Sequence, residues 1–290
     1  MAARQTKMNE QTLQLPREGD KIGSGIVLSL ISTGGSAAVY KTWVEALELH
    51  RAVKVMHPDA TEDIRDRIKT EARISSKLVH PNIVHVYHYG ETAAGLPFLE
   101  MDFVSGHTLA ALIAKRGALP LPIALAVVLG TLEGLHYAHT VNYTLYGVAH
   151  TSVMHRDIKP ANVILSIDTG FARLMDFGIA RPVEVSIHTV ADTVPGSVRY
   201  MPPEACAGGD CDMRSDIYQI GLLLYECVRG LPAFGQTDLT SLLAAKSAST
   251  YAPVETDRRA ALIIEKCMQH DPAKRYQSAL ECLWDVRRPT

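Results

Sequence analysis

Apolar and polar residues alternate through much of the first third of the chain, and this pattern predicts four short β-strands. The expected strands cover residues 28–31, 39–43, 51–56 and 96–104. Because successive side chains of a strand point to opposite faces, Ala52 and Lys54 share one face and Val53 takes the other. Lys54 is therefore expected to point inward, although a lone strand lysine is more often an exposed edge charge. Glu100 interrupts the last apolar strand, and we expect it on the exposed face.

A helix is predicted from about residue 62 to 78, because inward positions recur there at spacings of three and four. This stripe consists of Ile64, Ile68, Glu71, Ser75 and Leu78. Glu71 is its one charged member, and a carboxylate on a partly buried face is unfavourable without a cationic partner. The alternative is that this stripe is the solvated face of a charge-rich helix.

Residues 117–132 form an uncharged stretch that could suggest a membrane span. The stretch is shorter than the roughly 20 residues that cross a bilayer, and it holds Pro120 and Pro122 near its start. We therefore expect a buried helix over residues 122–139 and no membrane segment in this chain.

Two apolar runs, residues 163–165 and 174–175, flank the turn signal at residues 168–170 and predict a β-hairpin. Asn162 lies directly before the first run and Asp176 directly after the second. If the arms pair antiparallel, these two side chains meet at the open end of the hairpin. Amide and carboxylate oxygens are suitable ligands for Mg²⁺, which shares its coordination shell with phosphate and water.

The segment His-Arg-Asp-Ile-Lys-Pro-Ala-Asn at residues 155–162 precedes this hairpin, and Asp-Phe-Gly at residues 176–178 follows it. Asp157 can orient an attacking hydroxyl and accept its proton, and Lys159 can neutralise charge on a transferring phosphoryl group. The alternative is a surface turn rich in Asp, Asn and Pro. So many of the required residues fall in one short stretch that phosphoryl transfer from ATP is favoured.

From about residue 22 to 284 the chain resembles the protein kinase superfamily, and within it the eukaryotic-like (Hanks-type) Ser/Thr protein kinases of bacteria. The resemblance implies an α+β, two-lobed kinase fold: an antiparallel β-sheet N-lobe with one main helix, and a mostly α-helical C-lobe. The implied domain covers residues 22–286, with an N-lobe at about 22–103 and a C-lobe at about 104–286. Residues 1–21 are polar and mixed in charge, and we expect a flexible leader.

The resemblance also implies an ATP site between the lobes. Lys54 would hold the α and β phosphates with Glu71 as its partner, and Met101 would stand at the gatekeeper position before the backbone groups that bind adenine. The residues implied to bind the nucleotide are Ile31, Gly34, Gly35, Val39, Ala52, Lys54, Glu71, Met101, Asp102, Val104 and Ile164. The glycine-rich loop, expected at residues 32–38, departs from the family pattern, because Ser32 and Ala37 occupy two of its three glycine positions.

The catalytic residues carried over from the family are Asp157, Lys159 and Asn162, and the metal ligands are Asn162 and Asp176. Four residues are expected to be structural: Arg156, Glu204, Asp216 and Arg275. Glu204 would form a buried ion pair with Arg275 that fixes the substrate platform, and Asp216 would bond the backbone of the catalytic loop.

Residues 176–204 resemble an activation segment. Arg156, next to the catalytic aspartate, is expected to await a phosphate from this segment. We take Thr189 and Thr193 as phosphorylation candidates, because both lie just upstream of Gly196. Ser197 is expected to approach Asp157 and Lys159. The form Lys-Pro-Ala-Asn at residues 159–162 favours Ser/Thr over Tyr as the acceptor.

Residues 140–154 are an insertion relative to most kinases, which need only a few residues between the long helix and the catalytic loop. Asn142, Tyr143, Tyr146 and Gly147 suggest a small surface hairpin. The insertion either carries a partner or is simply tolerated, and we favour tolerance because surface loops accept added length at little cost.

Composition limits the alternatives. The 290 residues are 47% hydrophobic and 21% charged with a formal net charge of −2, which gives no indication of nucleic-acid binding. The five cysteines, an odd number without a C-x-x-C pair, indicate reduced thiols in the cytoplasm, and metal binding by Cys206 and Cys211 is disfavoured. The string G-x-x-x-x-G-K-[ST] of P-loop NTPases is absent.

The expected activity is therefore ATP-dependent phosphorylation of Ser/Thr hydroxyls of proteins, including the chain's own activation segment. The expected cofactors are ATP and Mg²⁺, with Mn²⁺ as the alternative ion. A homodimer would serve phosphorylation in trans. The rivals are a catalytically weak pseudokinase scaffold and a small-molecule phosphotransferase. The chain is expected to be cytoplasmic, either by itself or as the cytosolic part of a longer, membrane-anchored protein.

Overall fold

The structure, a computed structural model, describes residues 14–58, 61–177, 198–255 and 257–288. Its residues divide into two compact units. The first unit contains the chain up to Ala72 together with residues 86–103, and the second contains residues 73–85 and the chain from Val104 onward. Each unit has a hydrophobic core of its own.

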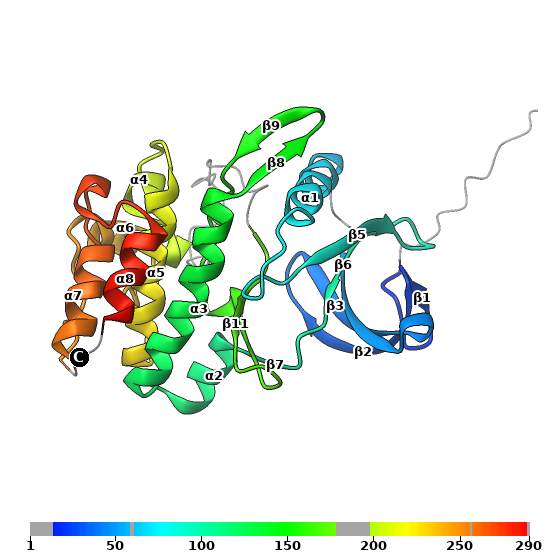
Figure 1. Ribbon diagram of the computed structural model, residues 1–290, viewed down its shortest axis with the longest axis horizontal. Helices are drawn as coiled ribbons and strands as arrows, with labels where there is room; N and C mark the ends of the chain where they lie inside the picture. Colours follow the sequence, from blue (N-terminus) through cyan, green and yellow to red (C-terminus); the bar gives the residue numbers. More distant parts are fainter. Residues whose placement is uncertain (1–13, 59–60, 178–197, 256, 289–290) are drawn as a thin grey trace, which may run out of the picture. The chain divides into compact units, whose positions relative to one another are not determined.

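The first unit is built on a six-stranded antiparallel sheet with the strand order β1-β2-β3-β4-β6-β5 (Figure 1). Its strands are β1 (Lys21–Ile22), β2 (Gly25–Thr33), β3 (Ala37–Val44), β4 (Leu49–Met56), β5 (Val86–Glu91) and β6 (Pro97–Asp102). A short 3₁₀ helix, η1 (Glu45–Leu47), connects β3 to β4, and the helix α1 (Glu62–Ser75) follows β4.

The alternation of side chains in β4 produces the core of this unit. Val53 and Val55 are fully buried, and they join Phe98 of β6 and Tyr40 of β3 in one cluster. Lys54 lies on the other face, where it is half-buried. The two-faced character expected for residues 51–56 is thus confirmed, and every strand predicted for this part of the chain is present.

Glu100 corrects one prediction, because it is buried at 4% exposure instead of lying on an exposed strand face. Both the backbone N–H and the hydroxyl of Ser24 donate hydrogen bonds to its carboxylate. These donors supply the polar partner that a buried carboxylate requires. A partner 76 residues away in the sequence leaves no local signal at Glu100 itself.

Several boundaries also differ from the prediction, among them those of the glycine-rich loop and of helix α1. The strands β2 and β3 extend into the expected glycine-rich loop, with Ser32 opposite Val39 and Thr33 opposite Ala38, so that only residues 34–36 remain between them. Helix α1 ends at Ser75, three residues before the predicted end, and turns continue the chain to Leu78. In both places the backbone hydrogen bonds set the end of the element. The pattern of apolar and polar side chains changes little there, so it does not show where the element ends.

Strand β2 is an edge strand over most of its length. Its outer side pairs with β1 only at Gly25 and Ile26. Register shifts interrupt its pairing with β3 between Val27 and Ser29 and again between Leu30 and Ser32. Leu30 is 54% exposed on this strand.

The second unit is mostly helical (Figure 1). Its α-helices are α2 (Leu109–Arg116), α3 (Leu121–Thr140), α4 (Pro203–Cys206), α5 (Met213–Arg229), α6 (Leu239–Ser247), α7 (Arg258–Cys267) and α8 (Ala279–Arg287). Three 3₁₀ helices belong to it as well, η2 (Pro160–Asn162), η3 (Val198–Tyr200) and η4 (Pro272–Lys274). Together the two units give the antiparallel sheet and the helical part expected of the kinase fold.

Helix α3 occupies the centre of this unit and packs against α5 and α8 (Figure 1). It spans 20 residues, one more at each end than predicted, and among the described helices it alone is long and apolar enough to cross a membrane. Half of its apolar window is buried inside the protein, and Val128, Leu132 and Leu135 are fully enclosed. It therefore serves as the core helix that the sequence predicts.

Two small sheets complete the second unit. Strands β10 (Val163–Ser166) and β11 (Ala172–Leu174) form the predicted antiparallel hairpin, with Val163 opposite Leu174, and β7 (Gly106–Thr108) adds a third strand. Strands β8 (Asn142–Leu145) and β9 (Val148–Thr151) form a separate hairpin within the insertion, as predicted.

Gly230, which ends α5, provides a test of this packing. Its φ is +72°, and a Cβ added there would lie 2.4 Å from the backbone nitrogen of Ala118. We expect Gly230→Ala to lower the free energy of unfolding by about 3 kcal/mol or more, because the left-handed backbone costs about 1–2 kcal/mol and the clash adds to it.

Gly208→Ala is the matched control, because Gly208 has φ +70° but open space around the added Cβ. Urea denaturation should show only the left-handed backbone cost, about 1–2 kcal/mol, for this variant. Equal losses for the two glycines would contradict the packing argument.

Candidate active site

The three residues predicted to be catalytic are bonded to one another in the second unit. Lys159 Nζ lies 2.9 Å from Asp157 Oδ2, and Asn162 Nδ2 donates to the same oxygen and to the Asp157 carbonyl, both at 2.8 Å. Asp157 and Asn162 are buried, at 4% and 5% exposure. Two donors on one oxygen fix the orientation of the Asp157 carboxylate.

Asp216, on the first turn of α5, holds the backbone that carries Asp157. Its carboxylate accepts hydrogen bonds from the backbone N–H groups of His155, at 2.8 Å, and Arg156, at 2.7 Å. His139 Nε2 lies 2.8 Å from the same carboxylate. Arg156 has φ +66°, a conformation that non-glycine residues adopt only when their surroundings enforce it.

The electrostatics of this cluster keep Asp216 ionised. Burial alone would raise the pKa of its carboxyl, but the hydrogen bond from His139 and the neighbouring donors outweigh burial and hold this pKa below its ordinary value. Burial also lowers the pKa of His155, so its imidazole is neutral near pH 7. Asp216 is therefore a fixed negative acceptor for the catalytic loop.

Gln219 is a further contact to the catalytic loop that the sequence reasoning missed. Its side-chain oxygen accepts from the Ile158 N–H at 2.9 Å, and its amide donates to the carbonyls of Arg156 and Tyr200 at 3.2 Å. Gln219 lies three residues after Asp216 on α5, on the same helix face. That spacing is the one sequence signal that could have identified it.

The β10–β11 hairpin positions the two predicted metal ligands at its open end. The backbone N–H of Met175 donates to the Asn162 carbonyl at 3.0 Å, directly before Asp176. Asp176 has φ +57°, and Phe177 beside it packs its ring 4.5 Å from that of His155. An amide oxygen and a carboxylate oxygen are hard donors that suit Mg²⁺, so the donor set fits the expected ion.

The ion pair expected between Glu204 and Arg275 is present. Both terminal nitrogens of Arg275 bond the two carboxylate oxygens of Glu204, each at 2.8 Å, and the Ser215 hydroxyl adds a third bond to the carboxylate. Arg275 is 2% exposed. Burial would raise the pKa of the Glu204 carboxyl, but the bonds from Arg275 prevail and lower it.

Lys246, in α6, is a buried cation that the sequence did not indicate. It is 1% exposed, and its ammonium donates to the Met201 carbonyl at 2.8 Å and lies 4.6 Å from the ring centre of Phe234. Burial is the main cause that lowers its pKa to about 8. Lys246 thus fixes the backbone just before Pro202 and Glu204.

In the first unit, the register of the sheet aligns several of the residues predicted to bind the nucleotide. Val39 pairs with Lys54 across β3 and β4, and Ala52 pairs with Met101 across β4 and β6. Directly paired residues share a sheet face, and so do residues two apart on one strand. Val39, Ala52, Lys54 and Met101 therefore line one face of the sheet.

The remaining nucleotide candidates lie in different places. In the first unit, Ile31 is 49% exposed on β2, Gly34 and Gly35 form the β2–β3 turn, and Glu71 is half-buried in α1. The Asp102 carboxylate accepts from the Tyr87 hydroxyl at 2.7 Å. Val104 and Ile164 belong to the second unit, where Ile164 pairs with Thr108.

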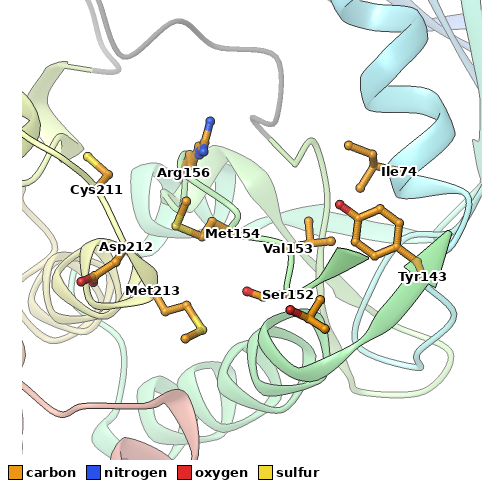
Figure 2. Close-up of a pocket in the computed structure, with 10 residues that line it drawn as sticks. Ile74, Tyr143, Ser152, Val153, Met154, Arg156, Cys211, Asp212 and Met213 are labelled. Atoms are coloured by element: carbon orange, nitrogen blue, oxygen red, sulfur yellow. The ribbon is translucent and has the colours of Figure 1, made fainter. Parts of the chain in front are cut away.

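Thr189, Thr193 and Ser197 lie outside the described residues, so their predicted roles stay predictions. Arg156, expected to receive a phosphate from this segment, has an exposed side chain without an ion-pair partner in the described part of the chain. Its guanidinium lies at the edge of a cavity of about 420 Å³ that Met154, Cys211 and Met213 also line (Figure 2).

The described part of the chain contains all five cysteines, which bear on the predicted thiol and metal chemistry. All five cysteines are free thiols, and burial raises the pKa of both Cys206 and Cys211. Among residues 14–58, 61–177, 198–255 and 257–288, no group of three or more His, Cys, Asp or Glu side chains is arranged to hold a metal ion.

Comparison with known proteins identifies the class. Residues 26–284 match the protein kinase domain family, and the chain belongs to this family.

Named relatives are bacterial Ser/Thr kinases. The chain is 34% identical over 275 residues to the probable serine/threonine-protein kinase PknB of Bifidobacterium longum, covering 89% of this chain and 38% of the relative. It is 32% identical over 286 residues to the serine/threonine-protein kinase PknB of Mycobacterium leprae, covering 94% of this chain and 43% of the relative. The chain thus spans about two fifths of the length of these relatives.

A solved structure shares the fold. The crystal structure of the PknI kinase domain of Mycobacterium tuberculosis superimposes with a TM-score of 0.68 at 25% sequence identity, covering 94% of this chain and 98% of that domain. This likeness bears out the predicted two-lobed kinase fold class.

The buried ammonium of Lys246 leads to a pH prediction. The unfolded pKa of about 10.5 lies above the folded value of about 8, so between these values the unfolded chain binds more protons and stability rises with pH. Because one pKa unit corresponds to about 1.4 kcal/mol, wild type should gain about 3 kcal/mol across this window relative to Lys246→Met.

The measurement is urea denaturation of both proteins at intervals from pH 7 to 10.5. Tyrosines and cysteines whose pKa burial raises contribute to both curves and cancel in the difference, apart from Cys206, whose raised pKa is partly offset by the Lys246 ammonium. Parallel curves for the two proteins would show that Lys246 is not buried as a cation.

Proposed function

We propose that this chain is a Ser/Thr protein kinase domain that transfers the γ-phosphoryl group of ATP to hydroxyl groups of proteins. The observation that carries the proposal is the bonded group of Asp157, Lys159 and Asn162 on a backbone held by Asp216. Membership of the protein kinase family and the Ser/Thr kinase names of the relatives support the same activity.

In this proposal Asp157 accepts the hydrogen bond of the acceptor hydroxyl and takes its proton as phosphoryl transfer proceeds. Lys159 Nζ, 2.9 Å from the Asp157 carboxylate, stabilises negative charge that develops on the transferred group. The bonds from Lys159 and Asn162 orient the carboxylate before the substrate arrives. Positioning and electrostatics then supply most of the rate enhancement.

Asn162 and Asp176 are the residues proposed to hold Mg²⁺, with Mn²⁺ as the alternative. These two residues would hold the ion, which would supply positive charge to offset the negative charge of the nucleotide phosphates. Lys54 is proposed to bind the α and β phosphates with Glu71 as its partner, and Ala52 to pack on adenine. The sheet face that Lys54 and Ala52 share with Val39 and Met101 supports the assignment of these four residues to the nucleotide.

A protein acceptor is favoured over a small molecule because of the segment around Pro202. Arg275 holds Glu204 from one side, and Lys246 holds the carbonyl of Met201. These bonds fix a surface that a small acceptor would not require. The Lys-Pro-Ala-Asn form of the catalytic loop supports Ser/Thr as acceptor, including Ser/Thr of a second copy bound as a homodimer.

The pseudokinase alternative rests on Ser32 and Ala37 in the glycine-rich loop, and nothing in the catalytic loop supports it. Domain limits of 22–286, a leader at 1–21 and a cytoplasmic location, as a whole protein or as part of a longer membrane-anchored one, complete the proposal.

The decisive experiment is incubation of the chain with Mg²⁺ and ATP followed by intact-mass measurement. Wild type should gain one or more phosphates. Asp157→Asn should gain none, or gain them at least about a hundredfold more slowly, because the general base is lost. EDTA should abolish the gain in wild type. Equal labelling of the two proteins would refute the assignment of Asp157.

A second experiment tests the activation segment. Thr189→Ala/Thr193→Ala should lose phosphate from this segment in a tryptic mass map and should phosphorylate added protein about tenfold more slowly, since a phosphate near Arg156 would order the segment. Thr169→Ala, in the β10–β11 turn, is the matched control and should keep wild-type activity. Full activity of the double variant would refute the regulatory role of phosphorylation at Thr189 and Thr193.

A further inference from the structure

The β8–β9 hairpin is a part of the chain that the proposed function does not use. Its strands pair in register from Asn142 opposite Thr151 to Leu145 opposite Val148. Tyr146 and Gly147 connect them with φ values of +50° and +79°. Positive φ at both central residues is the signature of the tight I′ turn, whose twist matches that of the strands. The insertion is therefore a defined hairpin and not an irregular loop.

The base of the hairpin is fixed to the second unit. Ser152 donates its backbone N–H to the Val141 carbonyl at 2.9 Å, and Val153 donates to the Ala138 carbonyl of α3 at 2.7 Å. The ring of Tyr143 stacks on that of His150 at 5.3 Å and packs against the core of this unit. These contacts give the hairpin a firm base on α3.

The tip of the hairpin contacts the last turn of α1, at residues 73–75, which belong to the second unit as the hairpin does. The guanidinium of Arg73 donates a hydrogen bond to the Tyr146 hydroxyl and lies 4.8 Å from the centre of its ring. The Tyr146 side chain is 69% exposed, so its role is this contact and not burial. A cation placed over a tyrosine ring is attracted to the ring face even at an exposed site.

A cavity beside this contact is lined by residues of both α1 and the hairpin. Ile74 is 7% exposed, and it lines the 420 Å³ cavity next to Tyr143, with the two side chains on the same side of it (Figure 2). Val153, just after the hairpin, lines the cavity beside them. Arg73 thus contacts the tip of the insertion, and Ile74 lines one cavity with Tyr143 of β8.

We propose that the β8–β9 hairpin is a brace that fixes the C-terminal turn of α1 through Tyr146 and so positions Glu71. Glu71 precedes Arg73 by two residues, and a helix turns about 100° per residue, so the two side chains project from nearly opposite sides. The brace therefore holds the helix without occupying the side that carries Glu71. Tyr146 and Arg73 are positioning residues, and this role of Glu71 rests on the proposed function.

Hydrogen exchange of the full chain, followed by mass spectrometry, tests the brace without relying on activity. Three variants share the same backbone requirement at residue 146: Tyr146→Ala, Tyr146→Lys and Tyr146→Glu. Losing a contact of this kind should speed exchange in the last turn of α1 about fivefold in Tyr146→Ala. Tyr146→Lys should match or exceed that change by repelling Arg73, and Tyr146→Glu should restore slow exchange by attracting it.

Steady-state kinetics give the second readout. Tyr146→Lys should raise KM for ATP or lower kcat about fivefold, with KM for the protein substrate unchanged, and Tyr146→Glu should recover most of the loss. Val148→Ala is the matched control, because Val148 is a 57% exposed residue of the same hairpin, and it should behave as wild type.

Unchanged exchange in α1 for both Tyr146→Ala and Tyr146→Lys would overturn the brace, as would equal behaviour of the Lys and Glu variants. Faster exchange with unaltered kinetics would overturn the link to Glu71. A wild-type protein that transfers no phosphate refutes the proposed function instead, and the exchange result then still decides whether the hairpin holds α1.

Discussion

The active site depends on the pair of hydrogen bonds that Asp216 accepts from the backbone of His155 and Arg156. The buried Asp216 carboxylate requires hydrogen-bond donors, and the Arg156 backbone at positive φ requires contacts that hold it there. The same two hydrogen bonds satisfy both requirements. Gln219 extends the arrangement by one turn of the same helix to Ile158. The conformation of the catalytic loop is therefore set by side chains of α5 as well as by its own sequence.

Much of this could be predicted where the signal is local. The alternation in β4, the hairpin around the turn at residues 168–170 and the apolar helix α3 all follow from side-chain periodicity, and the structure contains each of them. The trio around Asp157 lies within six residues, so a short motif identified its members. The bonds among them needed the structure.

The rest could not be predicted because the partners lie far apart in sequence. Glu100 is held by Ser24 across 76 residues, and Lys246 by Met201 across 45. Without knowledge of its partner, a carboxylate or an ammonium in an apolar segment is predicted to be exposed. Burying such a charge without a partner would cost too much free energy. The same holds for the insertion. Tyr146 and Gly147 allow its hairpin to be predicted, but the contact of Tyr146 with the distant Arg73 could not be predicted.

The edge strand β2 carries a consequence for the solution behaviour of the protein. Past Val27 its outer side has no strand partner in the described part of the chain, and Leu30 and Ile31 are about half exposed there. A regular, flat apolar edge would invite pairing with strands of other molecules. The two register shifts interrupt the regular spacing of its N–H and C=O groups and increase its twist. A strand from another molecule would therefore find few bonding groups in register, and we expect this edge to resist such pairing.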